Sequence, residues 1–212
     1  MNEEVRGRVG ISSPRGTHRV RAVSLDDFEL RQTSADALRL AGINDGDVLT
    51  EANIHQMIDD AEPQAAMNRA LRLLGHRERS TAELAGRLSD DGYADSVIGS
   101  VITRLADYGY LDDARFAEDY TRAKHSAGWG RRRIATGLSE RGVDPEVACR
   151  ALDSHTPEAK EIERAQAAIG ALDVSDRKGS AKALRRLVSR GFSYEVARAA
   201  LERCTRDAQD LG

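Results

Sequence analysis

One pattern constrains this chain more than any other: three segments align when Gly92, Gly142 and Gly191 are superposed, at spacings of 50 and 49 residues. A leucine lies four residues before each glycine, an apolar residue follows it directly, and a valine lies five residues after it. These columns contain Leu88, Leu138 and Leu187, then Tyr93, Val143 and Phe192, then Val97, Val147 and Val196. Helical repeats of this length usually bury apolar faces against their neighbours. The chain is therefore predicted to be mainly α, with tandem repeats in a curved array and with the leucine and valine columns buried.

Each of the three glycines is expected to close a helix. Glycine just past a helix readily adopts positive φ, and the apolar residue after it can pack back on that helix. The next helix then begins after a local signal, such as Asp144 followed by Pro145, or Ser193. One further helix precedes each pair, which gives nine helices in three three-helix bundles at 65–111, 112–155 and 156–206. Any helical protein contains glycine caps, but two apolar columns in register favour a repeat.

Two local signals support these boundaries. Ser80 followed by Glu83 forms a capping box, in which the Glu83 side chain can reach back to the Ser80 amide. Leu111 and Phe116 flank Asp112 as a hydrophobic staple around a helix start.

The residues before the repeats follow a different pattern. Apolar positions alternate on both sides of Leu25-Asp26-Asp27, which predicts two short strands joined by a turn. A short helix is expected over 34–42 and another from Thr50, as N-cap, to about Asp60. We therefore predict a small α+β module at 16–62, loosely packed or tethered by a linker at Pro63, without which the array should still fold. Residues 1–15 contain few apolar side chains, and we predict a disordered tail there.

Composition excludes several classes of protein. No apolar run approaches the ~20 residues of a membrane span, and the first residues lack a signal-peptide core, so we expect a soluble, cytoplasmic protein without membrane contact. Cys149 and Cys204 lie within apolar helical patterns, which suits buried thiols in a reducing compartment. The net charge of −3 is uneven: residues 1–64 carry −5, 65–156 carry zero and 157–212 carry +2. The overall charge alone predicts no nucleic-acid partner.

A run of three arginines, Arg131, Arg132 and Arg133, breaks a local rule. It follows Gly130, the expected N-cap, and so falls in the first turn of a helix, where the macrodipole disfavours each cation by ~0.3–1 kcal/mol. An incoming phosphate or acidic surface would reverse the sign of that effect. The alternative is that the arginines extend into solvent or pair with acids of a neighbouring repeat.

A second group of cations falls in the third repeat. Four of them follow one another at intervals of four residues: Lys178, Lys182, Arg186 and Arg190. Arg177 and Arg185 lie beside them, and no acid occurs between Asp176 and Glu195. Because like charges at this spacing repel, the helix face is a candidate anion-binding ridge, or else a plain solubilising face. The candidate binding residues are thus Arg131, Arg132, Arg133, Lys178, Lys182, Arg185, Arg186 and Arg190. Trp129 is either a wedge that anchors the helix turn or an exposed contact, and its large area favours the wedge.

No catalytic, cofactor or metal site is expected. The chain lacks a phosphate-binding glycine loop and a zinc-protease motif, and its five histidines fall on different elements. Paired acids such as Asp112-Asp113 lie at helix ends, where capping explains them. We therefore expect that the protein is not an enzyme.

Several short motifs, in order and in the right repeats, resemble the RecX family. They are Ala70 to Leu74, Arg79-Ser80, Glu83-Leu84, Gly109 to Ala117 and Gly128 to Ile134. The resemblance covers about 65–201, is weakest in the third repeat, and leaves the front segment as an extra module that many members carry. It implies a protein that binds the RecA filament on single-stranded DNA within its groove and inhibits the ATPase, recombinase and strand-exchange activities of RecA, with no catalysis of its own. We expect a monomer, and the two basic patches could also contact DNA phosphates directly.

One other function stays open at this point. Because the last two helices of each repeat could mimic a helix-turn-helix, the protein could instead bind DNA without sequence preference, or act as a helix-turn-helix regulator without RecA.

Overall fold

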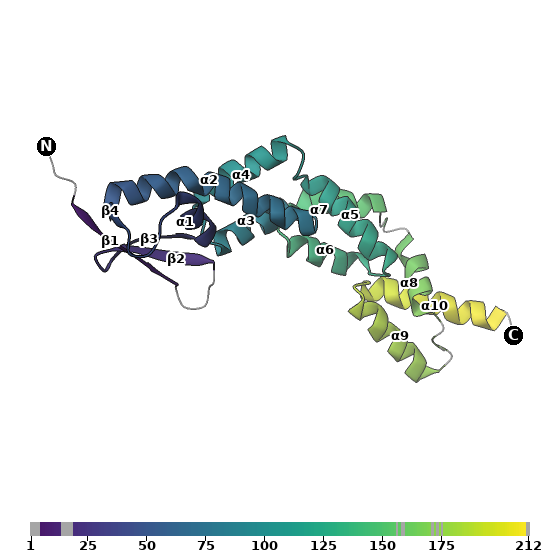
Figure 1. Ribbon diagram of the computed structural model, residues 1–212. Coiled ribbons are helices and arrows are strands. Elements are labelled where there is room, and N and C mark those ends of the chain that lie inside the picture. The colour runs from purple at the N-terminus through teal and green to yellow at the C-terminus, as the bar shows by residue number, and fades with distance from the viewer. Residues whose placement is uncertain are drawn as a thin grey trace. The chain divides into compact units, whose positions relative to one another are not determined.

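The structure is a computed structural model (Figure 1). It describes residues 5–13, 19–155, 157, 160–170, 172, 174 and 176–210, and for 207–210 it describes the backbone alone. The chain divides into unit 1, residues 1–112, and unit 2, residues 113–212. Unit 1 contains β1 (Arg6–Ser12), β2 (Val20–Leu25), β3 (Phe28–Ser34), α1 (Ala35–Ala41), β4 (Val48–Thr50), α2 (Glu51–His76), α3 (Thr81–Asp90) and α4 (Asp95–Asp107). Unit 2 contains α5 (Asp113–Ser126), α6 (Arg131–Ser139), α7 (Pro145–His155), α8 (Glu161–Ile169), α9 (Arg177–Ser189) and α10 (Tyr194–Asp210).

The front of unit 1 is an antiparallel sheet of order β3-β2-β1-β4, with α1 and α2 packed on one side (Figure 1). The predicted hairpin is confirmed: β2 pairs with β3, and Asp26 and Asp27 turn with φ of 47° and 70°. Aspartate tolerates this left-handed region better than most residues. The core between sheet and helices consists of Val9, Val23, Leu38, Ile43, Ile54 and Ile58.

The prediction of a disordered tail is wrong for Arg6–Ser12, which form the inner strand β1; residues 1–4, 14 and 15 lie outside the described residues. The glycines that suggested disorder have a steric role in the sheet. A Cβ on Gly10 would lie 2.4 Å from Oγ of Ser24 on the neighbouring strand. Val9, with only 1% of its surface exposed, anchors the strand in the core between the sheet and the helices.

The predicted linker at Pro63 is also wrong, because α2 passes through this proline without a break. Thr50 caps the helix as predicted, its Oγ1 accepting from the amide of Asn53 at 3.2 Å. A proline inside a helix removes a hydrogen bond and usually ends or kinks the helix. Here buried residues on both sides, Ala61 and Ala65 among them, keep the helix packed along its length.

The front module is joined to the first repeat by buried charges. The Glu62 side chain is 1% exposed, accepts from the amide of Ala94 at 2.9 Å and pairs with Arg31 at 3.2 Å. Asp91 pairs with Arg69 at 2.6 Å and with Arg19 at 3.4 Å. The predicted loose packing is therefore wrong: the module shares a helix and two buried carboxylates with the helices that follow.

The glycine caps take the expected form in all three repeats. Gly92, Gly142 and Gly191 have φ of 86°, 67° and 89°. The amide after each glycine donates to the carbonyl of the column leucine, from Tyr93 to Leu88, Val143 to Leu138 and Phe192 to Leu187, at 3.2, 3.2 and 3.1 Å. This six-to-one bond is the Schellman closure, and it explains why leucine and glycine recur at a fixed spacing.

Three apolar cores accompany the helices after the sheet. One includes Leu84, Leu88 and Leu105, a second Phe116, Ile134 and Leu138, and a third Ala183, Leu187 and Phe192. The leucine column is fully buried, whereas the valine column is half-buried, because the next residue in each repeat, Ile98, Ala148 or Ala197, points further into the core. From α2 to α10 the described residues contain the nine expected helices, the first of them fused into α2. Within the same residues, no helix is both long and apolar enough to cross a bilayer.

Candidate binding surface on helices α6 and α9

The start of α6 meets the end of α9 through backbone hydrogen bonds. The amide of Gly130 donates to the Arg190 carbonyl at 2.7 Å, and the amide of Arg132 donates to the Gly191 carbonyl at 3.1 Å. A Cβ on Gly130 would lie 2.4 Å from the backbone of Gly191, so only glycine permits this approach. Free amides at the start of α6 thus bind free carbonyls at the end of α9. The positive end of the α6 dipole also attracts the negative end of the α9 dipole.

Arg131 has a structural role at this junction. Its amide donates to Oε1 of Glu161 at 2.8 Å, and its guanidinium pairs with Oδ1 of Asp153 at 2.5 Å. Hydrogen bonding and charge from Arg131 lower the pKa of the Asp153 carboxyl, against a small opposing effect of burial. Because Glu161 is only 4% exposed, a buried carboxylate lies at the positive end of α6. The interpretation that the first turn of α6 is uncompensated is therefore wrong. The Arg131 guanidinium pairs with an acid of its own repeat, whereas its amide binds an acid of the next repeat.

Arg132 and Arg133 have exposed side chains, and neither forms an ion pair within the part of the chain that the structure describes. The Arg133 guanidinium lies over the ring of Trp129, with Cζ 3.9 Å from the ring centroid. Trp129 is half-buried against the core that contains Ile134, and its carbonyl accepts from Arg164 at 2.7 Å. The structure thus favours the wedge for Trp129 and places Arg133 on its outer side.

A set of alternating cations and rings extends from Arg133, and sequence reasoning missed it. Lys124 Nζ lies 4.8 Å from the Trp129 centroid and 5.4 Å from that of Tyr120, and Arg141 Cζ lies 4.7 Å from Tyr120. Arg141, Tyr120, Lys124, Trp129 and Arg133 are called the cation–aromatic ladder below. Its signal in the sequence is the four-residue spacing of Tyr120 and Lys124, which places this pair on one face of α5. Trp129 precedes α6, so its contact with Arg133 depends on the path of the chain into that helix.

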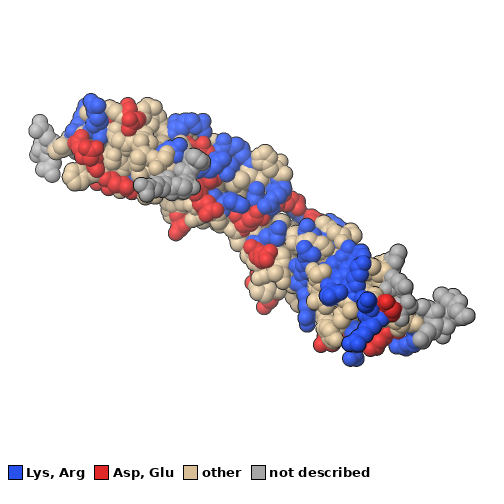
Figure 2. Space-filling model, turned by 90° about the horizontal axis from the view of Figure 1, so that it is seen from below, with Lys and Arg blue, Asp and Glu red and all other residues tan. Residues whose placement is uncertain are grey.

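The predicted ridge lies on the outer face of α9. Asp176 caps the helix, with its carboxylate accepting from the amide of Gly179 at 2.6 Å, while Ala183 and Leu187 are buried on the opposite face. Figure 2 shows Lys and Arg side chains gathered on the visible face of unit 2. Within the described residues, no ion pair neutralises the ridge cations, of which all but the half-buried Arg190 are exposed: Lys178, Lys182, Arg185, Arg186 and Arg190.

The structure brings the two predicted patches together at one end of the ridge. Arg190 ends α9 and binds Gly130 through its carbonyl, and its Nη1 lies 3.4 Å from where a Cβ on Gly128 would stand. The ridge and the exposed arginines of α6 therefore belong to one basic surface of unit 2, made of Arg132, Arg133 and the five ridge cations.

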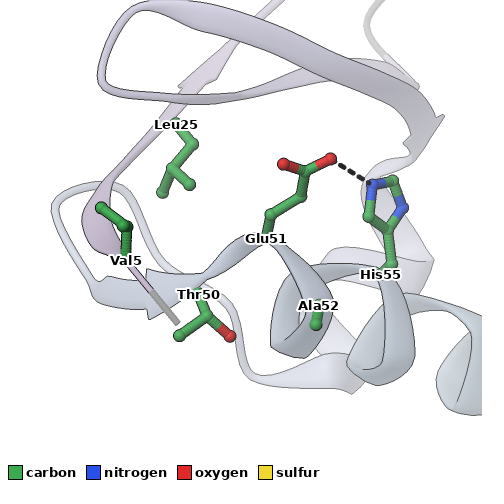
Figure 3. Close-up of a pocket in the computed structure, with 6 residues that line it drawn as sticks. All are labelled: Val5, Leu25, Thr50, Glu51, Ala52 and His55. Atoms are coloured by element: carbon green, nitrogen blue, oxygen red, sulfur yellow. Dashed lines mark ion pairs between the residues drawn. The ribbon is translucent and has the colours of Figure 1, made fainter. Parts of the chain in front are cut away.

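A hollow in unit 1 offers less chemistry. It has a volume of about 460 Å³, and within it Glu51 and His55 face each other at 3.8 Å along one turn of α2 (Figure 3). Both side chains are exposed, and the other lining residues that Figure 3 labels are Val5, Leu25, Thr50 and Ala52. No group of three or more potential metal ligands occurs among the described residues. The hollow therefore gives no candidate for catalysis.

Helices joined by repeated glycine caps, with a basic surface on the last repeats, define a helical repeat protein with one cationic face. Residues 66–105 and 112–152 match the family models described as the first and the second three-helix domain of RecX. The regulatory protein RecX of Chromohalobacter salexigens is 40% identical over 134 residues, which cover 62% of this chain and 88% of the relative. That of Bacillus velezensis is 31% identical over 194 residues, 89% of this chain and 73% of the relative. The chain belongs to the RecX family.

Solved structures agree with this assignment. The crystal structure of RecX from Lactobacillus salivarius is 25% identical, with a TM-score of 0.59 over 67% of this chain and 96% of that chain. A further crystal structure of a regulatory protein RecX has a TM-score of 0.58 over 91% of this chain at 20% identity, which supports the fold alone.

Proposed function

We propose that the protein regulates RecA by binding the RecA filament on single-stranded DNA and inhibiting its ATPase, recombinase and strand-exchange activities. The observation that carries the proposal is the unneutralised basic surface of α9 and α6 in a chain of the RecX family. A nucleoprotein filament is anionic, and exposed cations without carboxylate partners gain most from such a target.

The candidate residues divide into two roles. Arg132, Arg133 and the ridge cations Lys178, Lys182, Arg185, Arg186 and Arg190 contact the filament. Arg131 fixes the start of α6 through Glu161 and Asp153, and it supports the surface from within. The protein acts as a monomer, by binding rather than turnover, and needs no cofactor.

The test is a RecA ATPase assay on single-stranded DNA with the protein titrated in. A triple variant, Lys178→Glu, Lys182→Glu and Arg186→Glu, should raise the concentration for half-inhibition by roughly tenfold or more, since three lost contacts of about 0.5 kcal/mol each correspond to that factor. The matched control carries the same charge change at exposed positions outside the surface, Arg150→Glu, Arg203→Glu and Arg206→Glu. Equal inhibition by the ridge variant and the parent at one salt concentration would contradict the role of the ridge.

A second candidate is a DNA-binding protein that acts without RecA, for which the same basic surface would serve. DNA binding in the absence of RecA, with a steep fall as salt rises, together with an unchanged RecA ATPase, would favour this second function.

A further inference from the structure

The cation–aromatic ladder holds positive charge in a way that ordinary surface ion pairs do not. Lys124 and Arg133 each lie over an aromatic ring, and neither forms an ion pair with a carboxylate among the residues that the structure describes. A ring face attracts a cation through its quadrupole but carries no net charge, so the cation stays positive while its position is restricted. A guanidinium that stacks on a ring can still donate N–H groups to a phosphate. Arg133 Nη1 donates to the Ser189 carbonyl at 3.4 Å, so the other N–H groups of this guanidinium are the ones proposed for a phosphate.

The neighbourhood of the ladder argues for a particular kind of anion. Protein interfaces usually bury large apolar side chains at their centre. Among the described residues of unit 2, the exposed large apolar side chains are Val188 and Tyr194, and neither belongs to the ladder. Single nucleic-acid strands instead bind through phosphates on cations and through bases on aromatic rings or guanidinium planes. Cations held in place over rings, with guanidinium planes among them, fit that chemistry better than an acidic polypeptide, which has no bases to stack on a guanidinium.

We propose that the ladder binds a single strand of nucleic acid directly, with Lys124 and Arg133 on phosphates and with Trp129 and Tyr120 holding these cations in place. Arg132 and Arg190, beside Arg133 and Gly128, extend the path of the strand toward the ridge. The inference deepens the proposed function, because it names the part of the filament that this surface contacts. Binding to DNA alone is tested without RecA, so a failure here leaves the filament proposal standing on its own assay.

The full-length protein contains its own probe, because Trp129 is the one tryptophan of the chain. Titration with oligothymidylate at low salt, excited selectively at the indole, should produce a saturable change in Trp129 emission. The apparent affinity should fall as salt rises, because bound phosphates release counterions. Absence of any change in emission at concentrations where a labelled oligonucleotide binds would overturn the assignment to the ladder, and absence of binding would overturn it as well.

A double variant tests the two cations, with anisotropy of a labelled oligothymidylate as the measure of affinity. Lys124→Gln with Arg133→Gln keeps the first stem carbons that pack at the junction and removes both charges. Its affinity should fall about tenfold, and the slope of log affinity against log salt should become shallower by about 1.4, at 0.7 per phosphate on single strands. The control, Arg150→Gln with Arg203→Gln, should bind within about twofold of the parent, within the usual effect of exposed charges.

Two further outcomes decide the proposal. The conservative variant Lys124→Arg with Arg133→Lys should restore binding, which separates loss of charge from damage to the fold. Polyglutamate of matched charge should neither reproduce the change in Trp129 emission nor displace the oligonucleotide at equal concentration. If polyglutamate does both, the ladder recognises acidic polypeptide, and the proposal is wrong.

Discussion

At the scale of single residues, Gly191 serves two helices at once. It closes α9 with a φ of 89°, and its carbonyl accepts from the amide of Arg132 at the start of α6. A Cβ at this position would lie 2.3 Å from Cβ of Arg133. Gly191→Ala should therefore destabilise the protein by about 2–4 kcal/mol, from a left-handed backbone and a steric clash together. Gly109→Ala, with a φ of 72° and open space around it, should lose about 1–2 kcal/mol for the backbone alone. Urea unfolding of the two variants measures this difference. Equal losses in the free energy of unfolding would show that the backbones at the α6–α9 contact can shift to accommodate the new methyl group at little cost.

A second residue, His125 on α5, gives unit 2 a dependence on pH. Partial burial lowers the pKa of His125 from 6.5, and the positive charges of Arg164 and His155 lower it further. The unfolded chain therefore binds this proton more readily than the folded one, so stability is complete above about pH 6.5 and declines as pH falls below it. The melting temperature should fall between pH 7.5 and 5.5, and His125→Gln should reduce that fall. A pH dependence that is identical in the variant would assign the effect to other groups.

Acidic groups act in a lower pH window. Partial burial alone would raise the pKa of Glu83, but hydrogen bonds and charge from Arg77 and Arg79 outweigh it, so the pKa lies below 4.5. The stabilisation from Glu83 is thus present above its ordinary pKa and is lost only in stronger acid, which keeps it separate from the effect of His125.

At the scale of elements, the features that sequence reasoning found are those fixed by nearby residues. The glycine caps, the Thr50 cap and the β2–β3 turn depend on side chains within a few positions, so their patterns are visible in the sequence. The continuity of α2 through Pro63 and the strand around Val9 depend on distant packing instead. The carboxylate that compensates α6 comes from Glu161, which is 30 residues away from Arg131. The ridge was predictable as a charge pattern. Its proximity to α6 was not, because it depends on the contact between Gly130 and Gly191, which lie far apart in the sequence.

The three arginines of α6 should separate in a mutational test. Arg132→Glu places an acid at a helix start, with no ion pair to lose among the described residues, and should leave stability equal or higher by about 0.3–1 kcal/mol. Arg131→Glu breaks the pair with Asp153 and places a new carboxylate beside those of Asp153 and Glu161. It should lower stability by about 1 kcal/mol or more. Thermal melts and filament binding of both variants check this. Arg132→Glu should weaken filament binding without loss of stability, and a drop in its melting temperature would contradict the assigned roles.

At the scale of the whole molecule, the front module and the first repeat share one helix and a joint core. Ala37 of α1 belongs to the same apolar cluster as Leu84 and Leu88. Buried Glu62 accepts from the amide of Ala94 at the start of α4, and Asp91, at the end of α3, binds Arg19. Unit 2 has its own apolar cores, around Leu138 and around Leu187. The chain therefore divides into its two compact units near residue 112, and not near the proline where the sequence suggested a linker.

Truncation tests this division. Deletion of residues 1–62 removes the first half of α2 together with Ala37 and with Glu62, whose carboxylate accepts from the Ala94 amide, so the first repeat of the 63–212 fragment should unfold at lower urea and less cooperatively. Fragments 1–112 and 113–212 keep their cores intact, and each should show one helical circular-dichroism transition. Burial decides the expected direction: Glu62 is 1% exposed, and its deletion removes a part-buried hydrogen bond to the Ala94 amide together with the core contact of Ala37. A 63–212 fragment with the midpoint and slope of the parent would show that the shared helix contributes little, and that the front module is an appendage after all.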